Sequence, residues 1–516
     1  MAEAVETSQP TLRVKNKGLL TAAIMLAMVM QVLDTTIANV ALPHMRASLS
    51  ASQDEVSWVL TSYVVAAAIA TPLAGWLADR LGRRNLLLIG VVGFTLASLA
   101  CGIATSLPEM VLYRVAQGLF GATLAPLAQS IMLDINPREK MGQAMAMFGL
   151  GVMVAPIVGP TLGGVLTESL NWRWVFLVNL PVGILALVAL FFFMPKEETK
   201  KRRFDFFGFA MLAVAVAATQ MIFDRGSGVG WFESWEIWAY LGLAISGLWM
   251  FVVHCATAEN PFVDLGMFKD RNFVMGLIFI FLIGITTFSG LALLPPLLQN
   301  LFGYSVIDTG VLMAPRGVGT MVSMIFVGRF VSRVDARILV ISGLAISAWS
   351  LWMMTGFDIQ MDQGPIMLSG FLQGIGLGLV FVPLNTLAFA TIAPRLRVDA
   401  TAFFSLVRNV GQGVGISLVT AVLAQMMSVN QAELAARVTL NAGAVRDLPG
   451  VLAGVPSVLN QLSALVQQQA AMLAFLDDFH LMMILTFVSL PIVFLLRRPQ
   501  AAKPMTAEER AHAMGE

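Results

Sequence analysis

The stretch that decides the fold is residues 18–41, which read GLLTAAIMLAMVMQVLDTTIANVA. As a helix it is long enough to cross a hydrocarbon core of about 30 Å, and Asp34 is its one ionisable side chain. A carboxylate in hydrocarbon costs at least a few kcal/mol, so such residues usually face a polar cavity and function there. Because a carboxylate in such surroundings can exchange a proton near neutral pH, we expect Asp34 to serve a proton-coupled transporter.

The composition of the rest of the chain agrees with a membrane protein. The 516 residues are 57% hydrophobic and only 12% charged, against about 25% charged in ordinary soluble domains. The net charge is +1, and without a long basic stripe no nucleic-acid partner is expected. Cys101 and Cys255 lie in or beside apolar runs, so a disulfide framework is not expected. The polar start and the lack of a small-residue cleavage site indicate a retained first helix rather than a signal peptide.

Apolar runs of helical length recur along the chain and predict an all-α polytopic membrane protein with fourteen transmembrane helices. The predicted spans are 18–41, 56–78, 85–105, 108–131, 140–165, 173–194, 206–223, 236–256, 273–298, 308–331, 337–357, 365–392, 401–426 and 479–497. Most of the 32 lysines and arginines lie in one alternating set of loops and in the two terminal segments. The positive-inside rule therefore places both termini in the cytoplasm, and an even number of spans independently requires them to share one side.

An internal duplication organises these spans. Residues 75–84 read GWLADRLGRR after the second span, and residues 328–337 read GRFVSRVDAR after the tenth. A weaker echo links Gln117 and Gly118 to Gln373 and Gly374. Parallel repeats of six spans are a common transporter plan, with the substrate site at the repeat interface near the midplane. We therefore predict a 6+2+6 arrangement of spans.

This arrangement divides the chain into five segments. They are a cytoplasmic N-terminal tail (1–17), a first six-helix bundle (18–194), a linker with two extra spans (195–272), a second six-helix bundle (273–497) and a cytoplasmic tail (498–516). The second bundle includes a polar outer loop, 427–478, in which residues 458–476 have helical periodicity. This pattern suits a periplasmic or extracellular helical insert better than a membrane-surface helix. A variable surface loop is the interpretation that we favour for the segment.

The loop at 75–84 packs a small residue, an acid and three bases into a tight turn. Gly75 permits close helix approach, and Asp79 can lie at the N-terminus of a neighbouring helix. We predict a conformational latch formed by Gly75, Asp79, Arg80, Gly82, Arg83 and Arg84. The alternative is a basic loop that only sets the topology.

Arg114 lies inside the fourth span at a depth similar to that of Asp34 in the first. A buried arginine is always charged and needs a partner or a cavity. We predict that Arg114 modulates the proton affinity of Asp34, so that the two form the proton-coupling site. Alternatively, Arg114 extends toward the outer face or binds backbone carbonyl groups.

The fifth span contains a repeated pattern of glycine and proline. Glycines strip one helix face of side chains and allow close packing, whereas prolines free carbonyl groups and kink the helix. We predict a dry, tightly packed hinge at Pro156, Gly159, Pro160, Gly163 and Gly164. Ordinary small-residue packing is the alternative.

Polar and basic side chains inside the spans are candidates for a substrate cavity. We assign Gln31, Thr35, Asn39, Gln117, Arg316 and Arg408 to it. Arg316 and Arg408 could bind an acidic substrate, and a structural role is the alternative for each. The four histidines are widely scattered, and no phosphate-binding loop is present, so neither a metal, a cofactor nor an enzymatic activity is expected.

Together these motifs resemble a known family. The 75–84 loop, Arg114 with Gln117 and Gly118, and the GPTLGG segment at 159–164 resemble the hallmark motifs of drug:proton antiporters of the major facilitator superfamily. The sequence LDTTIANVALP at 33–43 resembles the signature of the fourteen-span branch, and the chain is similar to its EmrB-like subfamily of multidrug efflux pumps. The copy at 328–337 departs from the full loop motif, because Asp335 is displaced and the second glycine is absent.

The resemblance implies proton-driven export of hydrophobic or amphipathic toxic compounds across the bacterial inner membrane by alternating access, with Asp34 as the coupling carboxylate. It also implies a periplasmic adaptor of the membrane-fusion class and an outer-membrane channel as partners, with the outer loop 427–478 as the adaptor contact. A proton-coupled importer of a nutrient or metabolite is the nearer alternative, and the span-five motif argues against it. A non-transporting membrane sensor is the other, and it leaves Asp34 and Arg114 unexplained.

Overall fold

The computed structural model describes residues 12, 14–137, 140–197, 199, 203–226, 228–259, 261–330, 334–438 and 456–495. The described residues form helices joined by short turns and loops, with no strand among them. Most of the predicted tail 1–17, part of the outer loop (439–455) and the predicted tail 498–516 lie outside the described residues.

The helices follow the predicted spans in order. In the N-terminal half they are α2 (Lys17–Ser48), α3 (Gln53–Ala70), α4 (Leu73–Leu81), α5 (Arg83–Ile103), α6 (Leu107–Gly121), α7 (Leu124–Asp134), α8 (Met141–Ser169), α9 (Trp174–Leu177) and α10 (Asn179–Phe193). Between the halves are α11 (Phe206–Arg225) and α12 (Trp235–Thr257). The C-terminal half contains α13 (Arg271–Pro296), α14 (Val306–Phe330), α15 (Ala336–Met354), α16 (Gln363–Phe389), α17 (Arg397–Arg437) and α19 (Pro456–Ser489).

Three of the predicted spans are divided between two helices, and one of them is the 173–194 span, formed by α9 and α10. The 56–78 span consists of α3 and α4, which meet at an angle of 60°; Pro72 stands at the break and disrupts helical hydrogen bonding. The 108–131 span consists of α6 and α7, and Pro126 lacks the N–H that would bond to the carbonyl of Ala122. Among the described residues, 12 helices are long and apolar enough to cross a membrane, or 13 if α3 and α4 count as one span. The number of fourteen and the orientation of the termini stay predictions.

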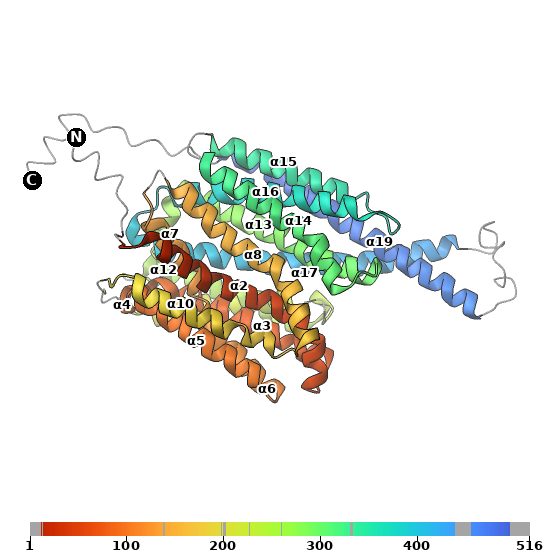
Figure 1. The fold of residues 1–516 in the computed structure, drawn as a ribbon, viewed down its shortest axis with the longest axis horizontal. Helices are drawn as coiled ribbons and strands as arrows, with labels where there is room; N and C mark the ends of the chain where they lie inside the picture. Colours follow the sequence, from red (N-terminus) through yellow and green to blue (C-terminus); the bar gives the residue numbers. More distant parts are fainter. Residues whose placement is uncertain are drawn as a thin grey trace, which may run out of the picture.

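The two halves lie side by side, with the red to yellow N-terminal helices in one group and the green to blue C-terminal helices in the other (Figure 1). α8 packs against α2 in its own half and against α14 across the interface. Small residues hold α8 and α14 close along their length. A Cβ at Gly164 would lie 2.8 Å from Val306 Cγ1, and a Cβ at Gly328 would lie 2.7 Å from the Cβ of Ala146. Such close helix contacts are typical of small residues in membranes.

The predicted hinge residues lie on α8, which continues through Pro156 and Pro160 as one helix. Two of its glycines face α2. A Cβ at Gly159 would lie 2.1 Å from Thr36 Oγ1, and a Cβ at Gly163 would lie 3.2 Å from the carbonyl oxygen of Ile37. The tight packing is therefore present, whereas a pivot at this point stays a prediction.

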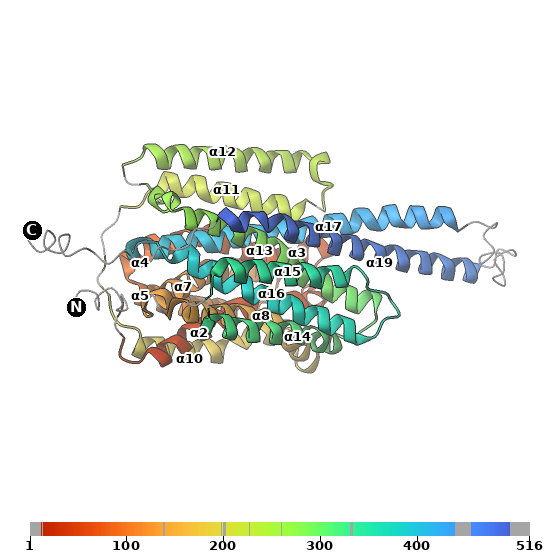
Figure 2. The ribbon, with the colours of Figure 1, turned by 90° about the horizontal axis from the view of Figure 1, so that it is seen from above.

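The two extra helices form a layer on one side of the molecule (Figure 2). α12 packs on α11, and α11 contacts α3 of the N-terminal half and α17 of the C-terminal half. The hydroxyl of Thr61 on α3 donates to Asp224 at the end of α11. The hydroxyl of Ser417 on α17 donates to the carbonyl oxygen of Phe223. α11 is thus bonded to both halves near one end of the molecule.

The outer loop predicted at 427–478 is mostly helical among its described residues. α17 continues to Arg437, and α19 begins at Pro456 and runs without a break to Ser489. The helix predicted at 458–476 is confirmed, but it is continuous with the last span rather than separate from it. α17 has 41 residues, or about 60 Å at 1.5 Å per residue, so both helices extend beyond the rest of the molecule (Figure 2). α19 also ends before the predicted limit of residue 497, because a short turn occupies Pro491–Leu495.

Candidate functional site

The Asp34 carboxylate lies inside the N-terminal half with no exposed surface. Arg114 on α6 donates from Nη1 to Asp34 Oδ2 at 2.5 Å, and both side chains of this ion pair are 0% exposed. The sequence analysis expected these two groups to approach each other, and the structure brings them into direct contact. A buried ion pair needs good geometry and further hydrogen bonds to offset its loss of hydration.

Two amide side chains supply those further hydrogen bonds. Gln117 Nε2 donates to Asp34 Oδ1 at 2.8 Å, and Asn179 Nδ2 donates to the same oxygen at 2.9 Å. Asn179 also donates to Ser98 Oγ at 3.0 Å, and Ser98 donates to the carbonyl oxygen of Phe176 at 2.9 Å. The sequence analysis missed Asn179 and Ser98. A primary amide at the start of α10, within an apolar span, was the available signal.

Other atoms of the Arg114 guanidinium contact the helices around it, whereas its Nη2 is buried without a hydrogen-bond partner among the described residues. Its Nε donates to the carbonyl oxygen of Val59 at 2.9 Å, and Nη1 also donates to Gln117 Oε1 at 2.8 Å. The guanidinium carbon lies 4.3 Å from the centre of the Tyr63 ring, a cation–π contact. Arg114 therefore binds a backbone carbonyl, as the alternative expected, and pairs with Asp34 as well. It does not extend to a surface.

The local sequence explains this placement. Arg114 and Gln117 are three residues apart and so share one face of α6. A Cβ at Gly118 would lie 2.5 Å from the carbonyl oxygen of Tyr63, so glycine allows α6 to approach α3. That approach brings Arg114 of α6 within hydrogen-bonding distance of the carbonyl oxygen of Val59, which lies on α3.

This arrangement can exist in two charge states. With Asp34 ionised, the carboxylate balances the charge of Arg114 and accepts all three donated hydrogen bonds. A proton on Asp34 removes its charge and one acceptor site, and the guanidinium loses its counter-charge. Asp34 has no exposed surface in this conformation.

The residues predicted to line a substrate cavity are not gathered in one place. Gln31 and Thr35 are half-buried and Asn39 is exposed, all on one face of α2, and Gln117 binds Asp34. Arg408 is half-buried on α17. Arg316 is buried and lines a small cavity within the C-terminal half, which contains none of the other five.

The predicted latch residues lie at one end of the molecule, where the two halves meet. A Cβ at Gly75 would lie 1.5 Å from Asp399 Oδ1 of α17, so Gly75 packs directly on the opposite half. Gly82 has a φ of +80° in the turn from α4 to α5, a conformation that favours glycine. The guanidinium of Arg80 lies over Trp76, 5.3 Å from the ring centre. Arg84 donates to the carbonyl oxygen of Phe191 at 2.6 Å. Asp79 lies on α4.

Arg83 connects this motif to an ion cluster that the sequence analysis missed. It donates from Nε and Nη2 to the carboxylate of Glu197, at 2.7 and 2.6 Å. It also pairs with Asp134 at the end of α7. Asp134 in turn pairs with Arg397 at the start of α17, and both of these side chains are buried. One buried carboxylate therefore joins bases from the two halves. The signal for this ion cluster in the sequence was Asp134, an acid at the end of an otherwise apolar run.

No group of three or more metal-ligating side chains occurs among the residues that the structure describes.

Comparison with known proteins agrees with this architecture. The family model described as "Major Facilitator Superfamily" matches residues 24–416. The chain therefore belongs to the major facilitator superfamily, and it is a multi-pass membrane transporter.

Individual relatives within the superfamily show which transporters this chain is similar to. The chain is 34% identical over 454 residues to the multidrug export protein EmrB of Escherichia coli strain K12, covering 87% of this chain and 89% of that protein. It is 34% identical over 481 residues to the fatty acid resistance protein FarB of Neisseria gonorrhoeae, covering 92% and 95%. Among solved structures, the human organic anion transporter MFSD10 (TETRAN) superposes with a TM-score of 0.57 at 16% identity, covering 91% of this chain and 99% of that one. This last likeness supports the fold alone.

Proposed function

We propose that the protein is a proton-driven antiporter that exports hydrophobic or amphipathic toxic compounds across the bacterial inner membrane. The observation that carries the proposal is the fully buried Asp34–Arg114 ion pair with its two amide donors. An ionisable pair at this depth is expensive to maintain and points to a proton pathway. The multidrug export protein EmrB, similar over most of the chain, supports the direction and the substrate class.

In the proposed cycle, Asp34 binds a proton from the outer side and releases it on the cytoplasmic side. Protonation removes the counter-charge of Arg114 and weakens the hydrogen bonds that join α2, α6 and α10. The relative stability of the inward- and outward-open states then changes. A potential of 100 mV supplies about 2.3 kcal/mol per proton, enough for a substrate gradient of roughly fifty-fold.

The substrate class includes acidic amphiphiles in this proposal. The relative FarB is named for fatty acid resistance, and long apolar chains with one charged group are amphipathic. The many methionines of the chain, 31 in all, would suit a pocket that adapts to different apolar shapes.

The proposed partners are a periplasmic adaptor of the membrane-fusion class and, through it, an outer-membrane channel. The observation in favour is the helical extension formed by α17 and α19, which projects beyond the other helices (Figure 2). A projecting helical pair offers a surface for another helical protein outside the membrane.

The deciding experiment measures substrate-driven proton release in inside-out vesicles carrying Asp34→Asn. Asparagine keeps the size of the side chain and cannot take up a proton. We expect substrate addition to drive proton movement in the wild type and none in the variant. The matched control is Asp358→Asn, an exposed acid in the loop after α15, which should behave as wild type. Undiminished proton release in Asp34→Asn would exclude the coupling role, and proton movement of the opposite sign in the wild type would identify an importer.

A further inference from the structure

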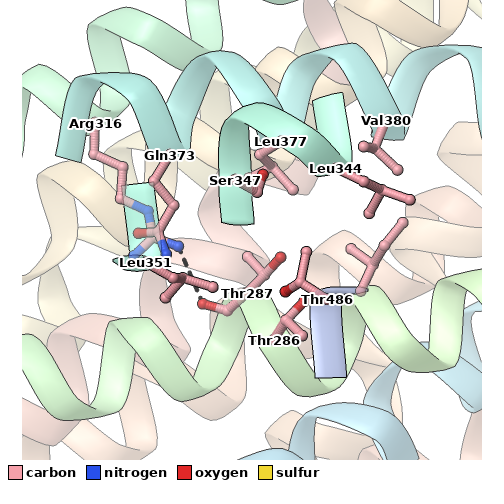
Figure 3. A pocket seen from close by; sticks show the side chains of 11 residues that line it. Thr286, Thr287, Arg316, Leu344, Ser347, Leu351, Gln373, Leu377, Val380 and Thr486 are labelled. Carbon is pink, nitrogen blue, oxygen red and sulfur yellow. Dashed lines mark hydrogen bonds between the residues drawn. The ribbon is translucent and has the colours of Figure 1, made fainter. Parts of the chain in front are cut away.

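A second polar site lies inside the C-terminal half, between α13, α14, α15, α16 and α19 (Figure 3). It is a cavity of about 40 Å³, enough for a few water molecules or one small polar group. Its polar lining includes Arg316, Gln373 and Thr287, and apolar side chains such as Leu344, Leu377 and Val380 line the remainder.

This cavity is the counterpart of the Asp34 site in the other half. The sequence offset that relates Gly75 to Gly328 also relates Asp34 to Thr287 and Tyr63 to Arg316. The carboxylate of the first half is therefore replaced by a threonine in the second.

The amide of the first site has its own counterpart, because Gln117 corresponds to Gln373 in the weaker sequence echo. The arginine, in contrast, comes from a different helix. The first half supplies it from α6 and the second half from α14. The second site thus keeps a cation and an amide but has lost the acid that balances them.

Arg316 is consequently a buried cation without an acidic partner among the described residues. Its Nη2 donates to the carbonyl oxygen of Thr287 at 3.1 Å. Its Nη1 and the Oε1 of Gln373 are both buried and have no hydrogen-bond partner in the part of the chain that the structure describes. Arg316 and Gln373 are only 4% and 6% exposed. Leaving a buried cation unbalanced and its Nη1 without an acceptor is costly, so a ligand that accepts a hydrogen bond and carries negative charge would stabilise Arg316.

Two donors converge on one point of this site. A Cβ at Gly290 of α13 would lie 3.4 Å from Arg316 Nη1 and 3.6 Å from Gln373 Nε2. Both nitrogens therefore lie close to the surface of Gly290 that carries no side chain, and an acceptor that approaches this surface could meet both of them. Arginine is well suited to bind a carboxylate there, since its planar donors match the two oxygens.

We propose that this cavity binds the carboxylate group of an acidic amphipathic substrate. The carboxylate contacts Arg316 and Gln373 beside Gly290, and the first carbons of the apolar chain contact Leu344 and Leu377. The cavity accommodates the head group, not the whole ligand. The inference rests on the proposed export function for its meaning, because it names the substrate class, but it is a binding site that can be measured without transport.

The test measures equilibrium binding of radiolabelled decanoate and of its neutral analogue decanamide to the purified full-length protein in lipid nanodiscs. Empty nanodiscs correct for partition into lipid, and an alkaline buffer keeps decanoate ionised. We expect the wild type to bind decanoate at least about tenfold more tightly than decanamide, since a hydrogen bond to a charged group contributes that much.

Three substitutions then locate the preference. Arg316→Gln removes the charge and should abolish it, whereas Arg316→Lys keeps the charge and should retain part of it. Gly290→Ala adds a methyl group at the convergence point without a clash shorter than 3.4 Å, and should weaken decanoate binding while leaving decanamide unchanged. Arg329→Gln is the matched control, because Arg329 lies at the exposed end of the same helix, α14, and this variant should bind as wild type.

Several results would overturn the proposal. They are equal binding of decanoate and decanamide by the wild type, a preference that persists in Arg316→Gln, or an equal loss in Arg329→Gln. Asp34→Asn separates this proposal from the proposed function, because it should stop transport and leave decanoate binding intact. If the wild type shows no preference for decanoate while Asp34→Asn still stops substrate-driven proton release, the proposed carboxylate site is wrong and the proposed antiport function is supported.

Discussion

At the residue scale, one carboxylate receives hydrogen bonds from three side chains on two helices. Arg114 and Gln117 come from α6 and Asn179 from α10. Each of the three donors therefore helps to hold the carboxylate on which the proposed coupling would depend. Their separate contributions can be measured by removing one donor at a time.

Asn179→Ala removes one of the two donors to Asp34 Oδ1. The carboxylate loses a hydrogen bond that helps to hold it in place beside α10, so substrate-driven proton release should fall by roughly tenfold. Stability should fall by about 1–2 kcal/mol. Proton release in vesicles and thermal unfolding in detergent measure the two effects.

Asn136→Ala is the control for this prediction. Among the described residues, Asn136 donates to the carbonyl oxygen of Met132 at the end of α7, so its loss should leave proton release unchanged. Undiminished proton release in Asn179→Ala would show that Asn179 does not act on the acid.

Part of this site follows from the sequence and part does not. Asp34 and Arg114 are single charges in apolar runs at similar depth, so their approach was predictable. Asn179 is uncharged, and neutral amides within spans are common enough that only the position of α10 beside α2 reveals its role. Asp134 was hidden for another reason, because an acid at the end of a span resembles an ordinary loop residue until α17 is seen beside it.

At the element scale, α8 is the helix that holds the interface together. Gly159 and Gly163 lie against α2, while Gly164 lies against α14. The glycines of this one motif therefore allow α8 to pack closely against two helices, α2 in the N-terminal half and α14 in the C-terminal half. Any movement between the halves has to be accommodated at these contacts, since a packed surface without side chains cannot absorb an added group.

Gly159→Ala tests this packing. The new Cβ would meet Thr36 Oγ1 at 2.1 Å, so we expect a loss of about 1–3 kcal/mol in stability from overpacking and at least a tenfold loss of transport. Thermal unfolding in detergent and drug export in vesicles measure the two effects.

A second substitution should relieve the clash. Thr36→Ala removes the hydroxyl, so the double variant should recover part of both losses. Gly242→Ala on α12 has no atom within 4 Å of the new Cβ and should be neutral. Full activity in Gly159→Ala would mean that α2 and α8 separate easily.

The projecting helices α17 and α19 show what helical periodicity in the sequence could not predict. A polar helix at 458–476 was predictable from spacing, but its continuation into the last apolar span was not. Spacing reports one helix at a time, whereas continuity depends on the pairing of α19 with α17. Asn430, whose Nδ2 lies 3.3 Å from Asp477 Oδ2, is one contact of that pairing.

Shortening the projection separates transport from assembly. Replacing residues 431–464 with a short Gly-Ser linker removes the projecting part of both helices and keeps Ala470 and the packed core below it. We expect transport in proteoliposomes to stay within about twofold of wild type, because the described residues of the deleted part are mostly exposed. We expect drug resistance of intact cells to be lost.

The reason is that the adaptor contact would be lost while the transport core remains. Drug-susceptibility assays and proteoliposome transport, done on the same variant, supply the two measurements. If cells carrying the shortened protein keep their drug resistance, the projecting helices are not the contact surface for the adaptor.

At the scale of the whole molecule, the halves are joined by different chemistry in different places. At the end predicted to be cytoplasmic, Asp134 pairs with Arg397 across the interface and Gly75 packs on Asp399. Deeper in the interface, Gln129 Nε2 donates to Asn385 Oδ1 at 2.7 Å. Alternating access requires the polar contacts at one end to open while others form.

The position of α11 between the two halves could not be predicted from the sequence. Two extra spans were predicted between the halves, but membrane helices present apolar surfaces to lipid and to each other alike. Composition therefore cannot say whether a helix stands apart or fills a groove. The polar residues Gln220 and Asp224 near the end of α11 were the signal, since Asp224 binds Thr61 of α3 and Gln220 lies beside Gly413 of α17.

The ion cluster at Asp134 offers the sharpest test of how the whole molecule switches. Asp134→Asn removes the carboxylate that joins Arg83 to Arg397 and leaves the buried Arg397 without this counter-charge. Because breaking a buried pair by removing one partner is strongly unfavourable, the closed arrangement at this end should lose at least about tenfold in relative population.

Spin labels at the exposed positions Asn85 and Arg395, one in each half, report that change as a distance distribution in double electron–electron resonance. Glu197→Gln is the matched control. It removes the other carboxylate bound to Arg83, which lies in the same half, and leaves the pair across the interface intact. We expect Asp134→Asn to lengthen the distance between the labels and Glu197→Gln to leave it unchanged. If both variants lengthen it equally, the cluster stabilises only the N-terminal half; if neither does, the halves are held together by their packed helices, and the ion pair across the interface is not a latch.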